Sequence, residues 1–218
     1  MLYIIEGANY VGKTTTLEIL KKKKAFITFY HPRFNDSQHY TFQYNVPPHA
    51  SGTWARTDGM IPSIHIPRDV VYQISHMTCM KYLMSVKDKK VILDRCFLSE
   101  MVYNELYAKQ IYHEFVNALK TNFPYKIFLL IVKDDDVLRN RIIERLKKDV
   151  AKGFGIRDSK GFVPEPETVE ERMKAQRAIE NKYIEFIQLF GLNTLFIDTS
   201  HLSKKEVARV IVDQGELT

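Results

Sequence analysis

The sequence GANYVGKT, residues 7–14, limits the possible folds of this chain more than any other feature. It matches the pattern G-x-x-x-x-G-K-[ST] and stands between an apolar run at 2–5 and a helical pattern at about 13–22. The two glycines, Gly7 and Gly12, let the backbone fold tightly enough for successive N–H groups to point at a phosphate. The motif therefore predicts a strand, a phosphate-binding loop and a helix, with a nucleotide as ligand.

Two side chains of this motif have expected roles. Lys13 should reach the β- and γ-phosphates of the nucleotide, and the Thr14 hydroxyl should ligate Mg²⁺. The motif does not indicate which reaction follows.

Short apolar runs alternate with helical patterns along the rest of the chain. Strands are expected at residues 2–5, 26–29, 91–93, 127–132 and 194–197. Helices are expected at about 13–22, 69–86, 98–120, 135–150, 167–190 and 203–213. The strand candidates are almost wholly apolar, as they must be in a parallel sheet covered on both faces. We therefore predict an α/β fold of the P-loop NTPase type, a doubly wound parallel sheet of about five strands with helices on both faces, in one domain spanning 1–218.

Composition excludes some classes of protein. The 218 residues contain no apolar run of 18, so we expect no transmembrane helix, and the early apolar strand leaves no room for a signal peptide. Cys79 and Cys96 read as reduced thiols of a cytoplasmic protein. The net charge of +6 suits a phosphate-rich partner, but it does not separate nucleotides from nucleic acid.

A second charged site follows the apolar strand expected at 91–93, in the stretch KKVILDRCFLSEMVYN. Ligands of open α/β sheets bind outside the carboxyl ends of the strands, so Asp94 should lie near the phosphate loop and hold Mg²⁺ directly or through water. The planar fork of Arg95 could grip a phosphate. The alternative for this Asp-Arg pair is a surface ion pair or a helix cap.

At this point the chain resembles the thymidylate kinases and the related deoxynucleoside kinases. Four stretches occur in the family's order: EGANYVGKTTTLEIL, VILDRCFLSEMVYN, PYKIFLLIVKDDDVLRNRI and TLFIDTSHLSKKEVARVI. The resemblance covers the chain except the 35–70 region, and it implies a kinase that uses ATP and Mg²⁺. It implies an ATP-binding set made of Gly7, Asn9, Tyr10, Val11, Gly12, Lys13, Thr14 and Thr15.

The resemblance also implies an acceptor side. Asp94 and Arg95 match the family's pair between metal and phosphates, and Ser99 and Tyr103 match its S-x-x-x-Y pattern near the acceptor. The acceptor-binding set is Asn9, Arg33, Phe34, Gln73, Arg95, Ser99 and Tyr103. Asn9 stands where thymidylate kinases commonly have Asp, Tyr10 replaces a usual Gly, and Cys96 replaces a usual Tyr.

Two irregular stretches complete the expected site. Arg141 and Arg145 share a helix face, a Gly-rich segment with Arg157 follows, and related kinases have a basic lid here, expected at about 141–166. The alternative is a solvated helix face. The expected catalytic set is Lys13, Asp94, Arg95, Arg141, Arg145 and Arg157. We also expect an acceptor-side insertion at about 35–68, whose aromatic residues either stack on a nucleobase or form a small satellite core.

The sequence thus favours a kinase that transfers the γ-phosphate of ATP to a deoxynucleoside monophosphate. One alternative is a deoxynucleoside kinase, which would phosphorylate a 5'-hydroxyl. Another class of protein, a kinase that acts on a DNA end or on a modified base, is also compatible with the basic charge. We expect a homodimer with a small-molecule nucleotide substrate and without a membrane partner.

Overall fold

The computed structural model describes residues 1–22, 27–30, 80–85, 87–88, 90–103, 109–151 and 169–215. By its internal contacts the chain divides into two compact units. The first unit comprises Met1–Ile5 and Lys21–Ile127, and the second comprises Glu6–Leu20 and Phe128–Thr218. Each unit is described below by itself.

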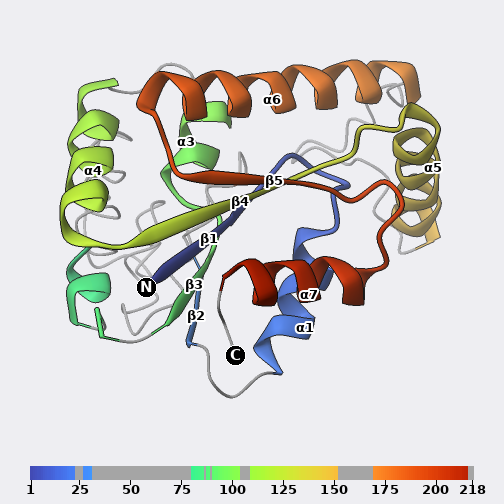
Figure 1. Ribbon diagram of the computed structural model, residues 1–218. Coiled ribbons are helices and arrows are strands. Elements are labelled where there is room, and N and C mark those ends of the chain that lie inside the picture. The colour runs from blue at the N-terminus through green and yellow to red at the C-terminus, as the bar shows by residue number, and fades with distance from the viewer. Residues whose placement is uncertain are drawn as a thin grey trace, which may run out of the picture. The chain divides into compact units, whose positions relative to one another are not determined.

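Five strands are described, and they hydrogen-bond in the order β2-β3-β1-β4-β5 (Figure 1). Their bounds are β1 Leu2–Glu6, β2 Ile27–Tyr30, β3 Val91–Asp94, β4 Tyr125–Ile131 and β5 Thr194–Asp198. After β1 the chain runs to β2 at one edge, returns to β3, and then crosses to β4 on the other side of β1. The direction of winding reverses between β1 and β3, where open α/β sheets bind their ligands. The predicted α/β class is confirmed.

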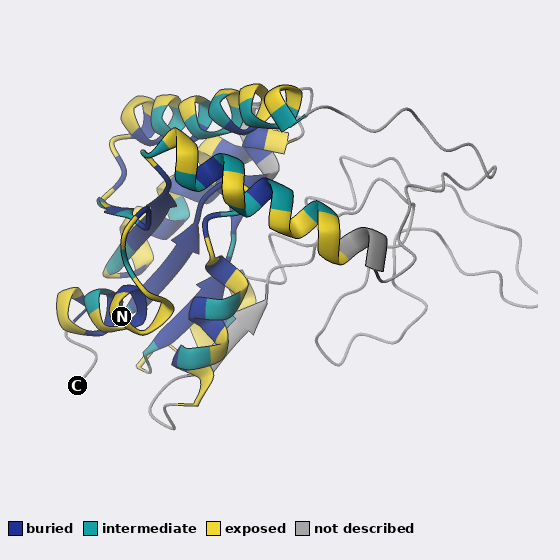
Figure 2. Ribbon diagram, turned by 90° about the vertical axis from the view of Figure 1, so that its right-hand side faces the viewer, coloured by how far each residue is buried: buried dark blue, intermediate teal, exposed yellow. Residues whose placement is uncertain are grey.

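In the first unit, β3 pairs in parallel with both β1 and β2. The register sets Asp94 level with Ile5 of β1 and with Tyr30 of β2. All side chains of β1 and β3 are buried, and these strands are dark blue in Figure 2. Asp94 is therefore a carboxylate brought to the end of an otherwise apolar strand, at the same level as the residue two before Gly7.

The helix expected at 98–120 is not one helix. The structure has α3 over Phe97–Tyr103 and α4 over Lys109–Asn122, and the rings of Phe97 and Phe115 lie 5.1 Å apart. Those two residues would be separated by about 27 Å along a continuous helix. The two helices therefore pack against each other and bury apolar side chains between them. The prediction of a single helix was wrong.

The second unit contains α1 Lys13–Lys21, α5 Asp135–Ala151, α6 Val169–Phe190 and α7 Lys204–Gln214. α5 packs on α6, and in Figure 1 α6 lies on one side of β5 while α1 and α7 lie on the other. The N-terminus of α7 is fixed by a capping box, in which Ser203 accepts from the Glu206 N–H and Glu206 accepts from the Ser203 N–H. The buried apolar side chains of this unit include Leu17, Leu20, Phe128, Leu130, Ile142, Tyr183, Ile187 and Ile211.

Parts of the sequence-based description lie outside the described residues. They include the insertion expected at about 35–68, most of the helix expected at 69–86 and the lid beyond residue 151. None of the helices in the described part of the chain combines the length and the apolar composition that a membrane span requires.

Candidate active site

The phosphate loop, residues 7–13 of the second unit, needs its two glycines. Gly7 has φ 138° and Gly12 has φ 91°, in the region that disfavours side chains. A Cβ on Gly7 would also lie 2.4 Å from the carbonyl oxygen of Leu130 in β4. Only glycine fits at Gly7, because the loop starts against the backbone of a neighbouring strand.

Lys13 lies inside this loop. Its side chain is buried, and Nζ donates hydrogen bonds to the carbonyl oxygens of Gly7 and Ala8. An ammonium group folded onto the loop carries its charge where the motif requires a cation for nucleotide phosphates. Thr14, the next residue, is exposed, and Thr15 is half-buried.

Three further carbonyls of the loop accept hydrogen bonds from side chains that are distant in sequence. Gln176 Nε2 on α6 donates to the Asn9 carbonyl at 2.6 Å. Arg141 on α5 donates to the Tyr10 carbonyl at 3.3 Å. Thr199 Oγ1 after β5 lies 3.2 Å from the Val11 carbonyl oxygen and 3.0 Å from that of Ile131, so its one hydrogen is shared between the two. We refer to Gln176, Arg141 and Thr199 as the carbonyl clamp. Sequence reasoning gave neither Gln176 nor Thr199 a role, although Thr199 lies in the stretch TLFIDTSHLSKKEVARVI that resembles the kinase family.

Tyr10 stands where thymidylate kinases commonly have glycine, and its backbone explains that preference. Its φ is 62°, a left-handed conformation that costs a residue with a side chain about 1 kcal/mol. The phenol is held by Arg172 of α6, whose guanidinium donates to the Tyr10 hydroxyl at 3.1 Å. The loop thus keeps a glycine-like backbone at this position while carrying a tyrosine.

Arg141 was expected in a lid, and the structure gives it contacts with the loop. Besides Tyr10, it donates to Thr199 Oγ1 at 2.9 Å and to the Thr199 carbonyl. Burial lowers the pKa of its guanidinium, and the charge of Asp198 raises it by less. Arg145, one turn further along α5, is exposed. Arg141 therefore contacts the loop and the turn after β5, whereas Arg145 is exposed.

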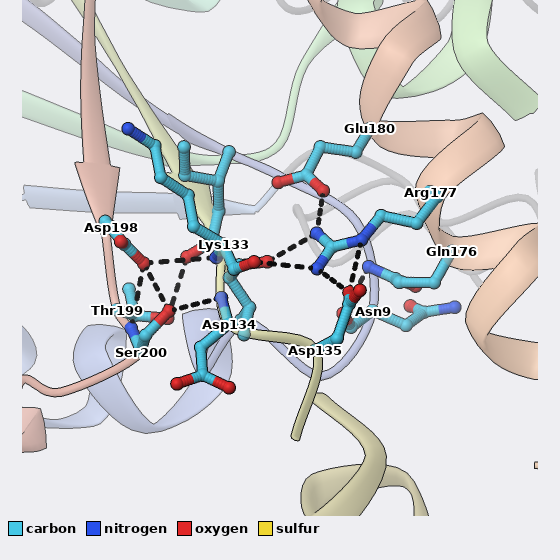
Figure 3. A network of polar contacts seen from close by, with 12 residues as sticks. Asn9, Lys133, Asp134, Asp135, Gln176, Arg177, Glu180, Asp198, Thr199 and Ser200 are labelled. Atoms are coloured by element: carbon cyan, nitrogen blue, oxygen red, sulfur yellow. Dashed lines mark hydrogen bonds and ion pairs between the residues drawn. The ribbon is translucent and has the colours of Figure 1, made fainter. Parts of the chain in front are cut away.

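α6 also fixes the connection between β4 and α5, as Figure 3 shows. Arg177 donates to the backbone carbonyls of Val132 and Lys133 and forms ion pairs with Asp135 and Glu180. Gln176 and its neighbour Arg177 thus secure two different segments of the second unit. The long helix acts as a support for the site.

Asp198 ends β5 and organises the next turn (Figure 3). It accepts hydrogen bonds from Ser200 Oγ at 2.6 Å, from the Ser200 N–H at 3.0 Å and from the Lys133 N–H at 3.2 Å. Burial raises the pKa of Asp198, but these hydrogen bonds outweigh it and hold the pKa below its ordinary value. Asp198 is therefore an ionised anchor for the residues that carry Thr199.

Glu6 is a fully buried carboxyl group at the end of β1, directly before the loop. The hydroxyl of Tyr183, a buried residue of α6, donates to Glu6 Oε2 at 3.3 Å. Sequence reasoning did not assign a role to either residue. The contact gives α6 another attachment at the start of the phosphate loop.

Three residues of the expected acceptor side, Arg95, Ser99 and Tyr103, lie in the first unit. Asp94 is buried, and the Arg95 N–H donates to the Ile5 carbonyl at 3.0 Å. The Arg95 backbone has φ 66°. Its guanidinium donates to Ser99 Oγ at 3.2 Å, and the guanidinium carbon Cζ lies 5.5 Å from the ring centre of Tyr103. The structure therefore brings Arg95, which precedes α3, into contact with Ser99 and Tyr103 of that helix.

The remaining predicted site residues are Asn9, which the structure describes, and several that lie outside the described residues. The Asn9 side chain is exposed. Arg33, Phe34, Gln73 and Arg157 lie outside the described residues. Within the described residues there is no group of three or more His, Cys, Asp or Glu side chains that could hold a metal by itself. The assignment of Thr14 and Asp94 to Mg²⁺ stays a prediction, since this ion is usually bound by one or two protein oxygens together with substrate phosphates.

Comparison with known proteins gives structural relatives only. Neither a protein-family model nor a curated protein matches the chain. The YorR protein of Bacillus subtilis in complex with phosphorylated GDP has a similar structure, with a TM-score of 0.59, 17% identity and coverage of 100% of this chain and 96% of that one. Deoxyadenosine kinase from M. mycoides with bound dATP has a TM-score of 0.52 at 16% identity, with 99% and 100% covered. This likeness shows the fold alone, an α/β fold that the chain shares with these two structures.

Proposed function

We propose that the chain is an ATP-dependent kinase that transfers the γ-phosphate to a deoxynucleoside monophosphate. The observation that carries the proposal is the phosphate loop, with Lys13 buried against its carbonyls and Gly7 pressed on β4. The fold is shared with a deoxyadenosine kinase that was solved with a nucleotide bound. Both features support phosphoryl transfer from a nucleotide.

Four of the described residues would have separate roles in such a reaction. Lys13 would neutralise charge on the β- and γ-phosphates, and Arg95 would hold a phosphate of the acceptor. Thr14 and Asp94 would hold Mg²⁺, which supplies further charge neutralisation when it is bound. The buried Asp94 ends β3 level with Ile5, two residues before the loop, which supports its assignment to the metal.

The choice of acceptor follows from proton chemistry. A sugar hydroxyl has a pKa far above 7, so a nucleoside kinase benefits from a carboxylate base near the end of the second strand. Here β2 ends at Tyr30, and the chain continues as HPRF with no Asp or Glu before Asp36. A monophosphate is already anionic at neutral pH, because its second pKa is about 6, and it needs cations instead. The exposed and neutral Asn9 and the oriented Arg95 suit that anion.

A deoxynucleoside kinase is the second candidate, and the named activity of the M. mycoides relative favours it. In that case His31 or Asp36 would have to act as the base. The experiment is a coupled assay with ATP and Mg²⁺ that compares each deoxynucleoside monophosphate with its nucleoside. We expect kcat/KM for at least one monophosphate to exceed that of its nucleoside by about 10²-fold, or about 3 kcal/mol.

Two results would change the proposal. Equal or better turnover of the free nucleoside would replace the monophosphate kinase by the nucleoside kinase. No turnover of either class, together with DNA binding that weakens steeply with salt, would favour a kinase that acts on nucleic acid.

A further inference from the structure

Gln176 is a buried polar residue on the inner face of α6 that the proposed chemistry does not use. Its side chain is 4% exposed, and its Nε2 donates to the Asn9 carbonyl at 2.6 Å. It is 167 residues away from Asn9 in sequence, and Figure 3 shows the two residues facing each other. A buried amide that donates to the phosphate loop points to a role in shaping that loop.

The geometry of the peptide group determines how this contact orients the loop. In a trans peptide the carbonyl of one residue and the N–H of the next lie in one plane and point in opposite directions. Holding the Asn9 carbonyl toward α6 therefore turns the Tyr10 N–H away from α6. Arg141 and Thr199 act in the same manner on the next two peptides, whose N–H groups belong to Val11 and Gly12.

The three clamped peptides are those whose N–H groups a phosphate loop uses. Phosphate affinity in such loops comes from successive N–H groups that are already oriented, so that little conformational freedom is lost on binding. Tyr10 makes this support more necessary, because it holds a left-handed backbone without being glycine. A loop without the clamp could relax one peptide and lose one of the oriented donors.

We propose that Gln176 is a positioning residue for nucleotide binding, which sets the Tyr10 N–H toward the phosphates by holding the Asn9 carbonyl from α6. The inference rests on the proposed function only in taking ATP as the ligand of the loop. Gln176 does not touch the nucleotide in this role. Its effect is confined to ligands that carry phosphate.

The test is Gln176→Met, which keeps the length of the side chain and removes the donor. The matched control is Gln188→Met, since Gln188 is an exposed glutamine on the same helix. Titration calorimetry measures Kd for three probes without Mg²⁺, namely ATP, inorganic tripolyphosphate and adenosine. We expect about 10-fold weaker binding of ATP and of tripolyphosphate by the Gln176 variant, as for the loss of one hydrogen bond that orients a charged-ligand site.

The adenosine probe separates positioning from general damage. Any measurable Kd for adenosine should be unchanged in Gln176→Met, and Gln188→Met should match the wild type for every probe. Gln176→Leu provides a second variant of similar size, whose side chain has no hydrogen-bond donor. It should weaken ATP and tripolyphosphate at least as much, and thermal melting establishes that each variant is folded.

Other results would overturn the inference. Wild-type affinity for tripolyphosphate in a folded Gln176→Met protein would exclude the positioning role while leaving the kinase proposal intact. Equal losses for adenosine and tripolyphosphate would make Gln176 a general packing residue. A wild-type protein that binds neither ATP nor tripolyphosphate would overturn the proposed function and this inference together.

Discussion

Tyr10 and Arg95 are the two non-glycine residues with left-handed backbones among the described residues, and they are held in opposite ways. Tyr10 is fixed by Arg141 and Arg172, which follow it by 131 and 162 residues. Arg95 is oriented by Ser99 and Tyr103, which follow it by only four and eight residues. The phosphate loop thus depends on distant helices, whereas the Arg95 side chain contacts the adjacent helix α3 and the Arg95 N–H donates to Ile5 of β1.

This difference indicates how each region should respond to substitution. Loosening α6 anywhere along its contacts should disturb the loop, because Gln176, Arg172 and Tyr183 all act from that helix. The Arg95 group should respond mainly to changes within residues 94–103. Backbone strain of this kind costs about 1–3 kcal/mol per residue and persists where surrounding contacts maintain it.

The largest effect is expected at the loop. Lys13→Ala should reduce kcat by about 10³-fold or more, because the side chain neutralises phosphate charge and its loss leaves the apolar core intact. Steady-state kinetics with a circular dichroism check of the fold measures it. Near-wild-type activity in the folded Lys13→Ala variant would show that this loop does not serve phosphoryl transfer.

A smaller effect is expected at Asp94. Asp94→Asn nearly preserves shape but removes a negative charge, so activity should fall on the order of 10²-fold, with the greatest loss at limiting Mg²⁺. The Kd for metal-free ATP should stay close to that of the wild type. A variant that keeps its full rate when Mg²⁺ is limiting would show that Asp94 does not serve the metal.

The smallest effect is expected at Ser99, and it sharpens the contrast with the loop. Ser99→Ala removes the hydroxyl that accepts from Arg95, so KM for the acceptor should rise by about 3- to 10-fold while Kd for ATP is unchanged. Ser85→Ala is the control, because the Ser85 hydroxyl donates only to the nearby Tyr82 carbonyl among the contacts described. A change in ATP affinity without a change in acceptor KM would show that Ser99 belongs with the loop.

The features predicted from sequence are those that depend on neighbouring residues. Strand and helix periodicity predicted the elements within a few residues, and the glycine motif predicted the loop between β1 and α1. The family resemblance assigned Arg95, Ser99 and Tyr103 to the acceptor side, and the structure shows these three sequence neighbours in contact. The single helix at 98–120 failed since the pattern carries no sign of the break that lets Phe97 pack on Phe115.

By itself the sequence determined the α/β class and the residues that a phosphate loop requires, since tight turns and strand burial restrict residue types locally. Only the tertiary structure decided how the loop is held. Gln176 and Thr199 look like ordinary polar residues of a helix and a strand end, and Arg141 looked like part of a lid. Their hydrogen bonds to consecutive loop carbonyls exist because folding brings α5, α6 and β5 to one place, and a one-dimensional pattern does not encode that proximity.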